Sequence, residues 1–211
     1  MATPTISLMP EISRLASFRV LTLAAITCVS GISYSASPDE HTASQLVDID
    51  GVIHQPFDDS SVRAVVLAFV ITDCPIANSY APELNRLHAD YDKRGVRIFV
   101  IQVDPDLAAD DARRHAKEYE LHPPVVLDNQ HVWVEMVGAT VTPEVAVLSP
   151  KEKVLYVGRI DDRYAALGKR REQPTSHDLR ETIDAILAGR AVPRSKTKAI
   201  GCHIPELQKE K

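Results

Sequence analysis

Residues 65–84 read VVLAFVITDCPIANSYAPEL, and the rest of the chain is organised around this stretch. Its first seven residues are apolar and rich in β-branched side chains, which predicts a short buried strand at 65–71. Behind the TDCP segment, apolar residues recur at helical spacing as far as Tyr91, which predicts a helix. The stretch therefore places Cys74 in the first turn of a helix, at the carboxyl end of a central strand.

This position makes Cys74 a candidate reactive thiol. Unpaired backbone N–H groups and the positive end of the helix dipole favour a thiolate at a helix start. Asp73 acts in the opposite direction, because a neighbouring anion raises the pKa of a thiol. A buried structural cysteine is the alternative interpretation, since free cysteine is often a core residue.

The strand–DCP–helix stretch resembles the thioredoxin-like superfamily, in particular its redoxin branch, the alkyl hydroperoxide reductase/thiol-specific antioxidant type. The resemblance begins at the VDIDG segment, residues 47–51, and continues to Thr142 and Pro143, so that it covers roughly residues 46–188. It implies an α/β protein with a thioredoxin-like fold, in which a central mixed β-sheet is flanked by helices. It also implies that Cys74 is the attacking cysteine.

Hydrophobic periodicity in the rest of the chain agrees with that fold class. A hairpin is expected at 46–57, around a turn at Asp50 and Gly51. A strand–helix–strand order, followed by a short helix, a second hairpin and a last helix, predicts a mixed sheet. The further strands are expected at 96–103, 125–127, 144–148 and 154–160, the helices at 107–120, 131–137 and 176–188, and a charged loop at 161–174.

Residues 1–36 have the layout of a secretory signal peptide. Arg14 and Arg19 precede a short apolar run at 20–29, which small residues follow. The run is too short for a permanent membrane span. We therefore expect an exported protein, periplasmic or extracellular; the alternative is a disordered cytosolic N-terminus. The expected organisation is a signal peptide at 1–36, a flexible lead-in at 37–45, a thioredoxin-like domain at 46–189 and a C-terminal tail at 190–211.

The chain contains three cysteines, and Cys28 lies within the expected signal peptide. A lipid anchor on Cys28 is the less favoured alternative, because Thr27 before it is larger than the small residue that lipoprotein processing prefers. The mature chain then holds Cys74 and Cys202, in a compartment that permits a disulfide.

The dithiol and peroxidase patterns of the superfamily match this chain only in part. Dithiol oxidoreductases carry a second cysteine three residues after the first, where this chain has Ala77. Peroxiredoxins carry a threonine three residues before the cysteine and an arginine on a neighbouring strand. Ile71 occupies the first of these positions, and Pro143 and Glu144 lie near the second. Peroxidase activity is therefore less favoured than disulfide exchange.

The resemblance implies a substrate site around Cys74. Thr142 and Pro143 match the pair that thioredoxin-like folds place opposite the active cysteine, with a cis peptide bond between them. The exposed backbone of Thr142 is then expected to pair with an extended substrate segment. Thr72 and Asp73, on the turn before Cys74, complete the expected substrate-binding residues.

Cys202 is a candidate resolving partner for Cys74, because Ala77 leaves Cys74 without a near partner. The alternatives are a free tail cysteine and a metal site. Thiolate and imidazole ligands suit copper or zinc, so Cys74, Cys202 and His203 form the alternative ligand set. The copper-delivering Sco proteins are also thioredoxin-like, but their two cysteines lie four residues apart on one loop, which this chain lacks.

Composition and motifs disfavour other classes of function. The net charge of −5 and the pI near 5.9 argue against a nucleic-acid surface. The sequence has no P-loop, no dinucleotide-binding glycine pattern and no recognisable Ser-His-Asp arrangement. No cofactor is expected.

These observations predict an exported thiol oxidoreductase, either a thiol–disulfide oxidoreductase or an antioxidant thiol peroxidase. Cys74 is expected to act on disulfide or peroxide substrates, with Cys202 as the resolving partner. Its expected partners are a protein disulfide or peroxide substrate and a thiol reductant, without nucleic acid or a stable membrane span. The alternative is a non-catalytic binding module with the same fold, which binds copper through Cys74, Cys202 and His203.

Overall fold

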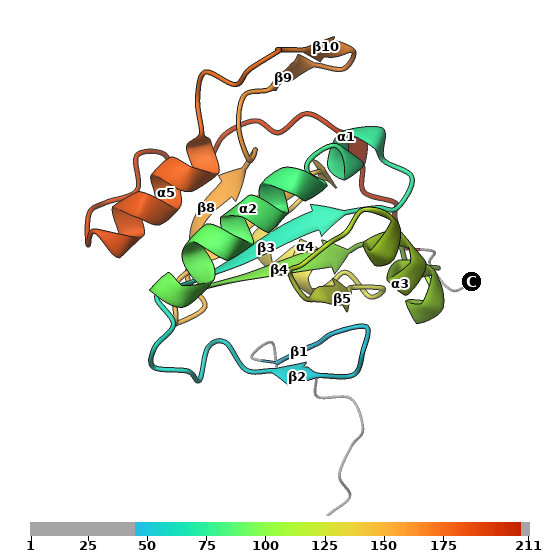
Figure 1. Cartoon of the computed structure of the whole chain (residues 1–211), viewed down its shortest axis with the longest axis horizontal. Helices are drawn as coiled ribbons and strands as arrows, with labels where there is room; N and C mark the ends of the chain where they lie inside the picture. Colours follow the sequence, from blue (N-terminus) through green and yellow to red (C-terminus); the bar gives the residue numbers. More distant parts are fainter. Residues whose placement is uncertain (1–44, 208–211) are drawn as a thin grey trace, which may run out of the picture. The chain divides into compact units, whose positions relative to one another are not determined.

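The computed structural model describes residues 45–207 (Figure 1). The expected signal peptide at 1–36, with Cys28 inside it, and the lead-in up to residue 44 lie outside the described residues, so these interpretations stay predictions. Within the described range, no helix is long and apolar enough to cross a membrane.

A five-stranded mixed sheet lies at the centre of the domain, with the strand order β5-β4-β3-β7-β8. The middle strand β3 (Ala64–Val70) runs parallel to β4 (Val96–Gln102) and antiparallel to β7 (Glu144–Leu148). Beside β4 lies β5 (Val125–Leu127), and β8 (Val154–Gly158) forms the antiparallel edge beside β7. The predicted mixed sheet and its second hairpin are confirmed.

All seven residues of β3 are buried, as expected for an apolar run that does not alternate with polar residues. Such a strand needs cover on both faces of the sheet. Figure 1 shows α2 (Ala81–Tyr91) crossing in front of β3. Ion pairs from Arg180 on α5 (Asp178–Leu187) reach Glu83 at 2.9 Å and Asp90 at 2.8 Å, and so join α5 to α2.

Short elements complete the domain. An antiparallel hairpin of two-residue strands confirms the turn that was predicted at Asp50 and Gly51. The remaining elements are β1 (Leu46–Val47), β2 (Ile53–His54), η1 (Asp92–Arg94), α3 (Ala109–Glu118), α4 (Val132–Val137), β9 (Tyr164–Ala166) and β10 (Lys169–Arg170).

Periodicity predicts one helix from Cys74 to Tyr91, but the helix is interrupted near Pro82, where thioredoxin-like proteins often have a kink. A four-residue helix, α1 (Pro75–Asn78), ends in a turn, and α2 begins at Ala81. In a continuous helix, residue 82 would donate its N–H to the carbonyl of Asn78, but Pro82 has no N–H to donate. Proline is tolerated only in the first turn, which is where α2 holds it.

The predicted start of the helix at 107–120 is also wrong. The backbone N–H of Leu107 donates to the carbonyl of Asp104 at 3.3 Å, and the Asp104 carboxylate accepts from the N–H of Asp106 at 3.0 Å. These bonds close a separate turn, so α3 begins only at Ala109.

The segment 161–174, predicted to be a charged loop, is partly ordered and partly buried. It contains the β9–β10 hairpin. Asp161, only 3% exposed, accepts a hydrogen bond from the Tyr80 hydroxyl at 2.5 Å. Because Tyr80 lies between α1 and α2, this bond ties the segment to the helix that follows Cys74.

The C-terminal tail lies against the sheet. Near its end, β11 (Cys202–His203) pairs antiparallel with β6 (Val141–Thr142), which directly precedes β7. Earlier in the tail, Lys196 forms a parallel bridge to Val157 on the edge strand β8. The tail therefore adds to the fold at two points that hydrophobic periodicity did not indicate.

Two leucines test how strongly the centre of the sheet stabilises the fold. Leu67 in β3 is fully buried, so Leu67→Ala is expected to lower the free energy of unfolding by about 2–5 kcal/mol. Leu167, in the β9–β10 hairpin, is 69% exposed, and Leu167→Ala is expected to change that free energy by less than about 0.5 kcal/mol. Urea denaturation measures both values. Equal losses would contradict this assignment of the core.

Candidate redox site

Cys74 occupies the N-cap position of α1, as the sequence predicts. Its sulfur accepts a hydrogen bond from the backbone N–H of Ala77 at 3.4 Å. As a thiol it also donates to the carbonyl oxygen of Thr142 at 3.1 Å, immediately before the cis Thr142–Pro143 peptide bond. The side chain is buried, with 0% of the residue exposed. Cys74 therefore lies beneath the surface, between α1 and β6.

Cys202 covers Cys74 from the tail. In the β11–β6 pair Cys202 lies opposite Thr142, and the sulfur atoms of Cys202 and Cys74 are 2.6 Å apart. Both thiols are free, and Cys202 is only half-buried. The structure thus brings together two cysteines that are 128 residues apart in the sequence.

Gly201 permits this close approach. A Cβ atom at position 201 would lie 1.9 Å from the carbonyl oxygen of Thr142 and 3.1 Å from the nitrogen of Pro143. Both contacts are with backbone, which cannot move aside as a flexible side chain can. Any residue larger than glycine would therefore force β11 away from β6.

Further attachments hold the tail on the edge strand β8. The N–H of Val157 donates to the carbonyl of Ser195 at 3.0 Å, and the N–H of Thr197 donates to the carbonyl of Val157 at 3.1 Å. The Thr197 hydroxyl lies 2.6 Å from the Tyr156 hydroxyl and accepts from the N–H of Arg159. The tail is thus fixed both before and at Cys202.

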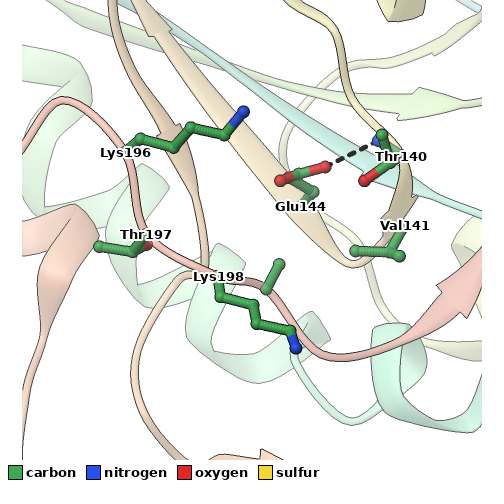
Figure 2. A pocket seen from close by; sticks show the side chains of 7 residues that line it. Thr140, Val141, Glu144, Lys196, Thr197 and Lys198 are labelled. Atoms are coloured by element: carbon green, nitrogen blue, oxygen red, sulfur yellow. Dashed lines mark hydrogen bonds between the residues drawn. The ribbon is translucent and has the colours of Figure 1, made fainter.

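A pocket of about 390 Å³ lies between these two attachments, beside β6 (Figure 2). Glu144 lines it and is 5% exposed; its carboxylate accepts from the N–H of Thr140 at 2.8 Å. Lys196 and Lys198 line it from the tail. At this position, space rather than packed side chains separates the tail from the start of β7.

The surroundings of Cys74 lower the pKa of its thiol below the ordinary value. Burial alone would raise the pKa, because it disfavours the charged thiolate. Hydrogen bonds from the Cys202 side chain, from the N–H of Ala77 and from the N–H of Cys202 act in the opposite direction and outweigh burial. These contacts therefore favour the thiolate form of Cys74 more than in an ordinary cysteine.

The thiol of Cys202 is affected in the opposite sense. Burial, the hydrogen bond to Cys74 and the negative charge of Cys74 raise its pKa to about 12, and the charge of Asp73 adds to this. Asp73 was predicted to oppose thiolate formation at Cys74, and in the structure its charge acts on Cys202. The two cysteines are therefore distinct: Cys74 has the lower pKa, and Cys202 is the more exposed residue.

The predicted substrate-binding residues lie around this pair, but Thr142 is not exposed. Thr142 is 0% exposed, and the tail occupies the strand edge that was expected to bind substrate. The Thr142 hydroxyl is buried without a hydrogen-bond partner. Thr72 and Asp73 form the turn before Cys74, where the carbonyl of Thr72 accepts from the Asn78 side chain at 2.7 Å.

The alternative metal site at Cys74, Cys202 and His203 gains no support from the structure. Within residues 45–207, no three His, Cys, Asp or Glu side chains are grouped so that they could hold a metal ion. Cys74 and Cys202 meet, but His203 is the next residue along β11, and successive side chains of a strand point to opposite faces. His203 therefore points away from the sulfur pair.

Sequence reasoning missed a polar network behind α1. His115, which is 8% exposed, lies 2.9 Å from the Asn78 side chain through Nε2 and 3.1 Å from the Gln102 side chain through Nδ1. The Asn78 side chain also donates a hydrogen bond to the carbonyl of Thr72. The one signal in the sequence was Gln102, a polar residue near the end of an apolar strand. This network supports the turn that positions Cys74.

The electrostatic coupling of the pair is testable by titration. Cys202→Ala keeps the strand pairing but removes the side-chain hydrogen bond to Cys74, so the pKa of Cys74 is expected to rise. Cys74→Ala is expected to lower the pKa of Cys202 towards the value of a free thiol. Ultraviolet absorbance of the thiolate against pH measures both shifts. His203→Ala is the control, and an unchanged pKa of Cys74 in Cys202→Ala would contradict the coupling.

Docking of the tail is testable through Gly201. In Gly201→Ala the added Cβ would clash with Thr142, so the tail is expected to detach and expose Cys74. Alkylation of Cys74 by iodoacetamide should then accelerate by at least about tenfold, because access controls thiol reactivity. Glu206→Ala, at an exposed tail position, is the matched control. Equal alkylation rates in the two variants would show that Gly201 does not hold the tail.

Comparisons with known proteins place this geometry in a family. Residues 50–167, more than half of the chain, match the family model described as Redoxin. An uncharacterised conserved protein from Geobacillus kaustophilus is similar in structure, with a TM-score of 0.67 and 26% identity over 79% of this chain and 89% of its own. A hypothetical protein from Sinorhizobium meliloti gives a TM-score of 0.64 and 26% identity over 76% of this chain and 88% of its own.

A more distant match concerns the fold alone. A candidate thioredoxin from Neisseria meningitidis is 19% identical over 68% of this chain and 87% of its own, with a TM-score of 0.52. A comparison with curated protein sequences gives no significant match. The mixed sheet, the cysteine at the start of α1 and the matched residues agree: the chain belongs to the Redoxin family and has a thioredoxin-like fold.

Proposed function

We propose that this protein is an exported thiol oxidoreductase whose Cys74 and Cys202 alternate between two thiols and one disulfide. The observation that carries the proposal is the 2.6 Å separation of their sulfur atoms. Membership of the Redoxin family supports it, since the matched region includes Cys74. The remaining cysteine, Cys28, lies in the expected signal peptide.

The net reaction transfers two electrons. In one direction the two thiols give two protons and two electrons to a substrate disulfide, which leaves as two thiols, and a Cys74–Cys202 bond forms. Cys74 supplies the stabilised thiolate of the cycle, and Cys202 completes the disulfide. A thiol reductant reverses the change and restores both protein thiols.

Disulfide exchange is favoured over peroxide reduction. Ile71 lies where the peroxidase pattern has a threonine, so no hydroxyl from that position is available to a peroxide. Glu144 stands near the expected arginine position, and its carboxylate is directed to the N–H of Thr140 and the neighbouring pocket (Figure 2). A carboxylate cannot supply the positive charge that an arginine would provide.

Export and partners complete the proposal. The signal-peptide pattern at 1–36 supports a periplasmic or extracellular location, where thiols and disulfides of other proteins exchange. The proposed partners are therefore a protein carrying a thiol or disulfide and a separate thiol reductant. The proposed cycle uses only the two cysteines as redox groups.

Stoichiometric oxidation of the mature protein by diamide tests the central claim. We expect one intramolecular disulfide, seen in non-reducing peptide mapping as a Cys74 peptide joined to a Cys202 peptide. Cys74→Ser and Cys202→Ser should each abolish this product and reduce turnover of a model disulfide to the uncatalysed rate. His203→Ala, next to Cys202 but pointing away from Cys74, should retain both. Intermolecular dimers as the main product, or full turnover in Cys202→Ser, would refute the function.

A further inference from the structure

The two cysteines of the pair differ in their exposure to solvent. Cys74 is 0% exposed and lies between α1, the carbonyl of Thr142 and the tail. Cys202 is half-buried, and His203 beside it is exposed. While β11 is paired with β6, an external molecule can therefore reach the pair only through Cys202.

We propose that an external thiol reduces the oxidised protein by attacking the sulfur of Cys202, with Cys74 as the leaving group. Cys202 then carries the mixed disulfide with the partner, and Cys74 never does while the tail is docked. This assignment rests on the function proposed above, and it identifies the sulfur atom that the thiol reductant attacks. It reverses the expectation that the cysteine at the helix start receives the partner.

The leaving group provides a second and independent reason. Disulfide exchange is faster when the departing thiol has the lower pKa. The N–H groups of Ala77 and Cys202 are positioned to stabilise a negative charge on the sulfur of Cys74. Attack on Cys74 would instead expel Cys202, where burial and the charge of Asp73 raise the pKa and so disfavour the departing thiolate. Access and leaving-group stability therefore select the same sulfur for attack.

The reaction proceeds in two balanced steps. The thiolate of an external thiol forms a bond to the sulfur of Cys202, the Cys74–Cys202 bond breaks, and its electron pair leaves on Cys74. A second external thiolate then attacks the partner's sulfur in the mixed disulfide and releases Cys202, which takes up a proton because of its raised pKa. Two external thiols are oxidised to one disulfide, and the protein disulfide is reduced to two thiols.

The suitable probe is a thiol that carries no other charged group. The charge of Asp73 acts on Cys202 and would alter the reaction rate of a reagent with a further charge. The oxidised protein, with its intramolecular disulfide verified, is mixed with 2-mercaptoethanol and quenched at early times with acid and N-ethylmaleimide. Peptide mass spectrometry then locates the adduct. We expect the mercaptoethanol disulfide on Cys202 and maleimide on Cys74, in an excess of at least about tenfold over the reverse arrangement.

A matched pair of variants gives a second measurement. Cys74→Ser and Cys202→Ser are each loaded with 2-mercaptoethanol as a mixed disulfide on the remaining cysteine, and release by dithiothreitol is timed. The adduct on Cys202 should be released at least about tenfold faster than the adduct on Cys74, because access limits exchange.

The outcomes separate the two proposals. Failure to form the intramolecular disulfide would overturn both the proposed function and this assignment. A disulfide that forms but gives its early adduct on Cys74, or on both cysteines equally, would overturn the assignment and leave the proposed function standing. Equal release rates from the two loaded variants would likewise contradict the assignment.

Discussion

The pairing of β11 with β6 is the contact on which the candidate site depends. Two residues on each strand hold together segments that are about 60 residues apart, and Gly201 allows the backbones to approach. Such a short pair gains little from its own hydrogen bonds. It is maintained because Ser195 and Thr197 fix the tail on β8 a few residues earlier, which shortens the segment that remains free.

The register of this pair determines which side chain meets Cys74. Because side chains alternate along a strand, a shift of one residue would direct His203 or Gly201 towards the site instead of Cys202. The backbone of Thr142 and Pro143 leaves room only for glycine at this point. A shift of register that placed a residue with a side chain there would produce a clash. The same pairing also occupies the strand edge of Thr142, so an extended substrate segment could bind there only after β11 has left.

The sequence was most informative where apolar patterns are long. The seven-residue run of β3, the start of α1 at Cys74 and the β7–β8 hairpin follow from periodicity and local capping. The tail could not be predicted in this way, because a two-residue strand has no period and its partner lies far along the chain. The exposure of Thr142 was misjudged for the same reason. Gly201 before Cys202 was the available signal, since an isolated glycine can mark a close backbone approach.

The tail both stabilises and covers the thiolate of Cys74, and these two effects cannot be separated. The Cys202 side chain and N–H lower the pKa of Cys74 only while β11 is docked, and docking is what buries Cys74. Release of the tail would expose Cys74 and remove those hydrogen bonds together. As an attacking nucleophile, Cys74 therefore gains little from its low pKa. As a leaving group it keeps the hydrogen bonds from the N–H groups of Ala77 and Cys202, because departure from Cys202 occurs with the tail still in place.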